Sequence, residues 1–170
     1  LPSDRNTGTA WWWLETSDGR GPYDDIEQRP LAERCICGSR STAGPPLLPN
    51  LYNNHKRIIQ TPEHVMILTE MNHDARIVRL NAEHRSFGAP SWFGDSVGFW
   101  EGETLVVETK NFAEFPPLSG ASAALQVTEF FTRQDDGAMH YRFIVEDSTI
   151  WTEPWGGEYV WPPSDGKLYE

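Results

Sequence analysis

Residues 125–146 read LQVTEFFTRQDDGAMHYRFIVE, and this stretch decides the fold class. Two runs rich in aromatic and β-branched residues flank Asp135-Asp136-Gly137. An Asp-Gly pair between alternating runs is the strongest short-range signal of a β-hairpin. The sequence therefore predicts two antiparallel strands, at 125–133 and 139–146.

The tip of this hairpin fixes the predicted pairing of its strands. With Asp136-Gly137 at the tip, Phe130 lies opposite Phe143, and Thr132 lies opposite Tyr141. The predicted core face then carries Phe130, Tyr141, Phe143 and Val145. The other face, polar with apolar interruptions, carries Glu129, Phe131, Arg133, His140, Arg142 and Ile144.

Short runs of the same kind precede the hairpin. Strands are predicted at 56–61, 65–71, 76–80, 97–100 and 104–112. The last two flank a turn at Glu101-Gly102, which sets Phe99 opposite Thr104. Seven short strands without a helix of ten residues between them favour a mainly β fold. We expect residues 51–170 to form one antiparallel up-and-down β-barrel, lipocalin-like, because closure removes exposed sheet edges. A β-sandwich is the alternative.

Residues 1–50 are predicted to form an irregular N-terminal arm. Pro and Gly recur too often there for long regular elements, although Pro30–Cys35 suits one short helix. Trp11-Trp12-Trp13 is the most apolar part of the arm. This trio either packs the arm onto the main body or offers an aromatic platform to a sugar or a flat ligand.

Composition excludes several classes of function. The 170 residues include 14 Lys and Arg against 25 Asp and Glu, a net charge of −11, so we expect no nucleic-acid partner. No run approaches the roughly 18 apolar residues of a membrane helix, so no membrane insertion is expected. Cys35 and Cys37 lack a second pair, and the histidines form no ligand motif, so we expect no metal. A glycine-rich phosphate loop is also missing, and no cofactor is expected.

Two polar clusters, at 52–55 and 70–76, are the candidate site. Glu70 follows Met66 and Leu68 on one face of its strand, and a carboxylate buried there needs a partner. In the catalytic hypothesis, Glu70 and His73 transfer protons and Arg76 stabilises an anion. The alternative is a structural Glu70–Arg76 ion pair at the barrel rim.

Further residues are predicted to contact a ligand, and Glu129 is one of them if the polar face of the hairpin lines the barrel. Tyr52 and Asn54 would orient the ligand, Glu129 would join the polar cavity, and Trp151 and Trp155 would close one end. The full set of predicted ligand-binding residues is Tyr52, Asn54, Trp100, Glu129, Trp151 and Trp155.

Five strings along the chain belong together: Glu33-Arg34-Cys35, Tyr52-Asn53-Asn54, RIIQTPEHVMILTEMNHDARIV from Arg57, GDSVGFWEGETLVVETKNF from Gly94, and WTEPW from Trp151. These strings resemble a large family of uncharacterised exported bacterial proteins. The likeness covers about residues 31–170. It implies an exported protein, periplasmic or extracellular, and it brings no established reaction with it.

The leading hypothesis is an exported β-barrel that binds a small, partly apolar or aromatic ligand. In its catalytic form the protein is a metal-free lyase, isomerase or hydrolase. The alternative is a non-catalytic accessory subunit that docks onto a larger envelope complex through its Trp-rich arm. A carbohydrate-binding module is a third hypothesis. The expected partner is accordingly a small-molecule ligand or another protein.

Overall fold

The computed structural model describes residues 26, 34, 44–49, 52–86, 88–114 and 116–168. The predictions for the tryptophan trio, the short helix and the two cysteines rest on residues outside this set. The described part is mainly β, as predicted. Its elements are β1 (Lys56–Gln60), β2 (His64–Thr69), the 3-10 turn η5 (Met71–His73), β3 (Ala75–Leu80), β4 (Asp95–Glu101), β5 (Thr104–Lys110), β6 (Gln126–Arg133), β7 (Met139–Glu146) and β8 (Trp155–Trp161).

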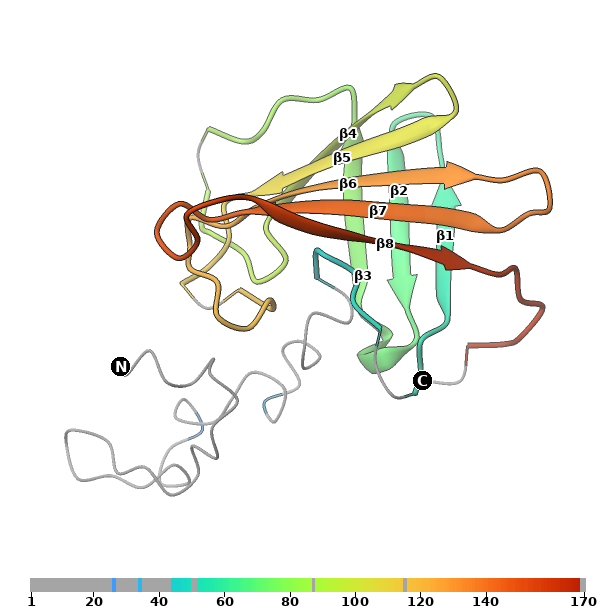
Figure 1. Ribbon diagram of the computed structural model, residues 1–170, viewed down its shortest axis with the longest axis horizontal. Coiled ribbons are helices and arrows are strands. Elements are labelled where there is room, and N and C mark those ends of the chain that lie inside the picture. The colour runs from blue at the N-terminus through green and yellow to red at the C-terminus, as the bar shows by residue number, and fades with distance from the viewer. Residues whose placement is uncertain are drawn as a thin grey trace.

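The eight strands form one sheet in chain order, from β1 at one edge to β8 at the other (Figure 1). The β-sandwich alternative needs two sheets and does not describe this arrangement. Six of the seven strand pairs are antiparallel. Strands β3 and β4 are parallel, with Arg79 opposite Val97 and Leu80 opposite Gly98, so the sheet departs here from the predicted antiparallel order. The two strands are parallel because the long connection over 81–94 carries the chain back toward the end of the sheet at which β3 begins, so β4 runs in the same direction as β3.

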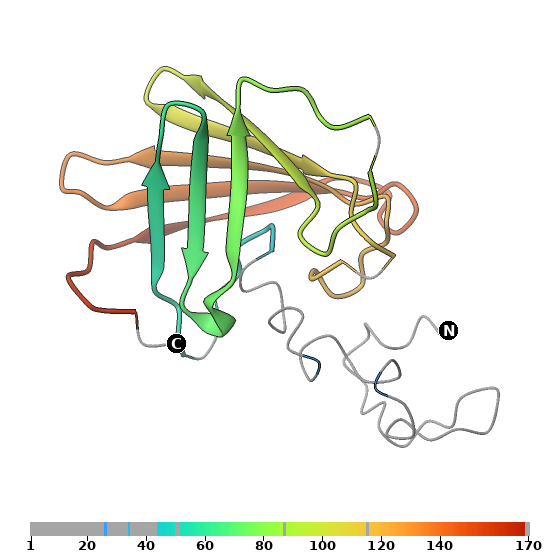
Figure 2. The ribbon, with the colours of Figure 1, turned by 180° about the vertical axis from the view of Figure 1, so that it is seen from behind.

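The sheet curls into a half-barrel. Strands β1 to β3 cross β5 to β8 at a steep angle, as both views show (Figures 1 and 2). Gly98 permits the close approach at the bend, because a Cβ atom there would lie 2.8 Å from Cγ1 of Val78. Apolar side chains from both halves fill the space between them, among them Val65, Ile67, Val78, Val107, Val127, Phe131, Tyr141, Phe143 and Val145.

The β6–β7 pairing differs from the prediction by one residue. Phe130 lies opposite Arg142 and Glu129 lies opposite Phe143. The loop is longer than a two-residue turn: the Gln134 amide donates to the Ala138 carbonyl at 2.8 Å. A slip of one residue exchanges the two faces of a strand. Glu129, which is 0% exposed, therefore belongs to the core face, and the predicted core face is wrong for β6.

The same exchange occurs in β2. The residues that face the core are Val65, Ile67 and Thr69, whereas Met66 and Leu68 are only partly buried. The predicted face with Met66, Leu68 and Glu70 inward is therefore wrong for the strand itself. Glu70 is buried nonetheless, because it lies just beyond the end of β2, at the start of the η5 turn.

A segment before β1 packs inside the half-barrel. Residues 44–47 are buried, and Leu47 is only 1% exposed and belongs to the core. The amide of Leu47 donates a hydrogen bond of 2.8 Å to the Tyr141 hydroxyl. The last residues of the predicted arm thus contribute to the core of the sheet.

Candidate functional site

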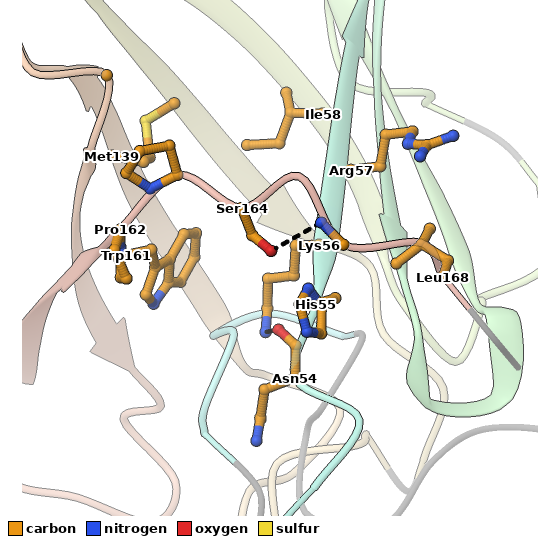
Figure 3. A pocket seen from close by; sticks show the side chains of 13 residues that line it. Asn54, His55, Lys56, Arg57, Ile58, Met139, Trp161, Pro162, Ser164 and Leu168 are labelled. Atoms are coloured by element: carbon orange, nitrogen blue, oxygen red, sulfur yellow. Dashed lines mark hydrogen bonds between the residues drawn. The ribbon is translucent and has the colours of Figure 1, made fainter.

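A pocket of about 700 Å³ lies between the two edge strands, β1 and β8 (Figure 3). Its size falls within the range of small-molecule sites. The lining comes from the start of β1, the start of β7, the end of β8 and the segment after β8. The lining residues are Asn54, His55, Lys56, Arg57, Ile58, Gly137, Met139, Trp161, Pro162, Pro163, Ser164, Gly166 and Leu168.

The segment 162–168 forms one wall of the pocket. It leaves β8 at Trp161 and passes close to His55, since a Cβ atom on Gly166 would lie 3.1 Å from Cε1 of the His55 ring. The amide of Gly166 donates to the Ser164 hydroxyl at 3.1 Å, which turns the segment locally (Figure 3). The absence of a side chain at Gly166 thus allows the segment to approach the beginning of β1.

Alternation along β1 sorts the side chains of the pocket. Lys56 and Ile58 lie on the same side of the strand as Trp161 and Met139, whereas Arg57 points the other way (Figure 3). The Lys56 Nζ atom lies 5.2 Å from the centroid of the Trp161 ring. It also donates to the Asn54 carbonyl oxygen at 3.2 Å. Burial lowers the pKa of Lys56 from its usual value, since an ammonium loses hydration there.

The charge of the lining differs from that of the chain. His55, Lys56 and Arg57 line the pocket, and none of the described lining residues is acidic. Yet acidic residues outnumber Lys and Arg by 25 to 14 in the whole chain. Within the described residues, no carboxylate forms a salt bridge with Lys56. The pocket therefore combines an apolar wall with a positively charged group that lacks an acidic protein partner in this part of the chain.

Behind the pocket, Trp161 contacts a buried network of charged and polar side chains. Trp161 stacks on Tyr141 with ring centroids 4.6 Å apart. The Tyr141 hydroxyl donates to Oε1 of Glu129 at 2.9 Å, and Arg76 donates to both oxygens of the same carboxylate. Burial, and next the charge of Glu129, raise the pKa of Tyr141 well above its usual value. These contacts fix the position of the tyrosine behind the pocket.

The three predicted catalytic residues do not line the pocket. Arg76 pairs with Glu129, so the predicted Glu70–Arg76 ion pair is wrong. Arg76 lies in β3 and faces the core, whereas Glu70 faces the segment before β1 and its Oε2 atom accepts the His55 amide at 3.3 Å. His73 is exposed, in a turn with a positive φ of 43°.

The predicted ligand-binding residues are distributed over several parts of the sheet. Asn54 lines the pocket, and Tyr52 lies nearby in the chain but is 64% exposed. Trp100 is exposed near the end of β4. Trp151 and Trp155 form an edge-to-face pair with centroids 5.6 Å apart, outside the pocket lining.

Sequence reasoning missed the central residues of the pocket, which are Lys56, Ile58, Met139 and Trp161. A signal for two of them exists in the alternation of Lys56, Arg57 and Ile58, which places the lysine on the face of an apolar neighbour. Trp161 lies at the end of β8, a strand that the sequence prediction did not include. Without β8, the sequence prediction contained only the β1 side of the pocket.

A second charged cluster lies beside the long connection between β3 and β4. Arg79 donates to both oxygens of Asp95 at 2.9 and 3.0 Å, and the Arg85 amide donates at 2.9 Å. Nδ1 of His84 lies 3.2 Å from the same carboxylate. Burial alone would raise the pKa of Asp95, but these hydrogen bonds outweigh it and lower that pKa. The cluster attaches the connection to the start of β4.

In the described ranges, no three His, Cys, Asp or Glu side chains are grouped so as to hold a metal ion. No helix in the same ranges has the length and apolar character needed to cross a membrane. A scan against protein-family models, a search of curated proteins and a search of solved structures each return no match. The functional argument therefore rests on the geometry of the pocket.

Proposed function

We propose that this protein binds a small organic acid with an apolar or aromatic body in the pocket between β1 and β8. The observation that carries the proposal is the lining itself. Ile58, Met139 and Trp161 offer apolar surface, Lys56 offers a positive charge, and no acidic residue is found among the described residues of the lining. A carboxylate on an apolar body matches both properties of such a site.

The proposal concerns binding, because Glu70, His73 and Arg76 do not line this pocket. It retains the expectation from the sequence that the protein is exported. It also retains the finer idea of a lipocalin-like barrel, in the sense of a curled sheet that holds one ligand at an opening. The accessory-subunit hypothesis depends on the tryptophan trio of the arm, and it stays a prediction from the sequence.

Isothermal titration calorimetry with three ligands of equal chain length tests the proposal. Octanoate, octanol and octylamine have the same apolar body and differ in the charge of the head group. We expect octanoate to bind most tightly and octylamine least, since the ammonium of the ligand would face Lys56. Equal affinities for octanoate and octylamine would refute the proposal.

Two lysine variants locate the site. Lys56→Met removes the charge but keeps an apolar side chain of similar length, and it should weaken octanoate binding about tenfold, or about 1.4 kcal/mol. Lys110→Met is the matched control, because Lys110 is exposed at the end of β5 and lies outside the lining. A similar loss in both variants would show that octanoate binds elsewhere.

A further inference from the structure

We infer that Lys56 also captures aldehydes and ketones as covalent imines within the pocket. The inference rests on the proposed function, because the same apolar walls would hold the body of the carbonyl compound. It adds a reaction at the Nζ atom, which binding of a carboxylic acid does not require.

The surroundings of Lys56 favour an amine that reacts. In the described residues its Nζ atom has a carbonyl oxygen at 3.2 Å and an aromatic ring at 5.2 Å as neighbours, but no carboxylate as a salt-bridge partner. Burial lowers the pKa of Lys56, which increases the fraction of neutral amine at a given pH. A lysine desolvated in an apolar pocket is a recognised form of activated nucleophile.

The position of the amine suits a ligand with a carbonyl head. Lys56 and Ile58 point toward the Trp161 and Met139 walls, so an apolar chain on those walls brings its head group to the Nζ atom (Figure 3). The Asn54 carbonyl oxygen accepts a hydrogen bond from the Lys56 nitrogen, which orients that nitrogen in the pocket. His55 lines the same pocket and supplies a titratable group for proton transfer.

The reaction balances without a further reagent. The lone pair of the neutral Lys56 nitrogen attacks the carbonyl carbon and forms a C–N bond, while the π electrons of the C=O bond move to oxygen. One nitrogen proton passes to that oxygen and gives a carbinolamine. The C–O bond then breaks, the second nitrogen proton leaves with the oxygen as water, and the C=N bond forms. Nothing is oxidised or reduced.

The chain is well suited to a test by reductive trapping, because Lys56, Lys110 and Lys167 are its only lysines. The full chain is incubated with octanal and sodium cyanoborohydride at neutral pH, and the alkylated positions are followed over time by peptide mass mapping. Lys110 and Lys167 are both exposed and serve as internal controls in the same molecule. We expect Lys56 to be alkylated at least about fivefold faster than either control.

Octanoate separates this inference from the proposed function. If octanoate binds and selectively slows alkylation of Lys56, both are supported. If octanoate binds but the three lysines react at equal rates, the imine inference fails alone. If octanoate does not bind while Lys56 still reacts fastest, the proposed function fails and the capture of carbonyl compounds stands. Lys56→Arg should abolish the fast alkylation, with its folding checked by circular dichroism.

Discussion

Tyr141 and Trp161 lie nearly parallel, with ring centroids 4.6 Å apart and planes inclined by 18°. Trp161 is a wall of the pocket, and Tyr141 is completely buried and bonded to Glu129. The stack therefore joins the wall of the pocket to the buried ion pair of the core. Changes deep in the half-barrel should consequently be detectable at the pocket.

Replacing Glu129 with Gln tests the buried ion pair. The variant leaves the Arg76 guanidinium buried without a carboxylate, and we expect a loss of about 3–5 kcal/mol in the free energy of unfolding. Urea denaturation measures this loss. The control is Glu158→Gln, whose carboxylate pairs with His140 but has a side chain 65% exposed. An exposed pair contributes little, so a comparable loss in the control would contradict the expectation.

Replacing Tyr141 with Phe tests the hydroxyl that bridges two parts of the core. This hydroxyl donates to Glu129 and accepts the Leu47 amide, so its removal leaves two buried polar groups short of a partner. We expect a loss of about 1–3 kcal/mol in stability. Tyr159→Phe is the control, because Tyr159 stacks on Tyr141 with centroids 6.4 Å apart but takes no part in these hydrogen bonds. Equal effects on thermal denaturation would count against the bridge.

Replacing Asp95 with Asn tests how the free energy of unfolding depends on pH in the acidic range. The folded-state pKa of Asp95 is lowered, so its contribution is fully present above the unfolded-state pKa of about 3.9 and is lost as the pH falls through the lower, folded-state value. The stability difference between the protein and Asp95→Asn should thus shrink below about pH 4. Chemical denaturation at several pH values measures it. Asp135→Asn, at the exposed tip of the β6–β7 hairpin, should show no such trend.

The pH dependence of octanoate binding tests the charge on Lys56. The ammonium form binds the carboxylate, so affinity is present below the pKa of Lys56 and is lost as the pH rises through it. Because burial lowers this pKa, the loss should begin at a lower pH than for an ordinary lysine of pKa about 10.4. In Lys56→Arg the guanidinium stays charged, and this loss should disappear. Calorimetry between pH 7 and about 11 distinguishes the two profiles.

Seven of the eight strands were predictable, but the buried faces of β2 and β6 were not. For β4 and β5, the predicted turn sets Phe99 opposite Thr104, whereas in the structure Glu101 lies opposite Thr104. This shift of two residues keeps each side chain on its predicted face of the sheet. For β6 and β7 the shift was one, which moved Glu129 from the predicted polar face into the core. The shift of one in β6 and β7 arises because the loop that carries Asp136-Gly137 has one residue more than the predicted two-residue turn.

The pocket was harder to predict because its walls depend on β8. The strand begins with Trp155-Gly156-Gly157, and two adjacent glycines favour a turn in sequence-based reasoning. Pairing with β7 overrides that preference, with Gly156 opposite Ile144. A Cβ atom on Gly156 would lie 2.2 Å from the Phe143 carbonyl oxygen, so tertiary contact requires the glycine. This requirement is visible only when the neighbouring strand is in place.

The location of the pocket between β1 and β8 also has a consequence for biosynthesis. Its two main walls come from the first and the last strands of the sheet, which lie about a hundred residues apart in the chain. The ribosome synthesises β1 long before β8, so seven strands can pair while the pocket still lacks one side. On the proposed function, binding of a ligand would require that β8 has been synthesised, because a chain that stops after β7 would lack the Trp161 wall.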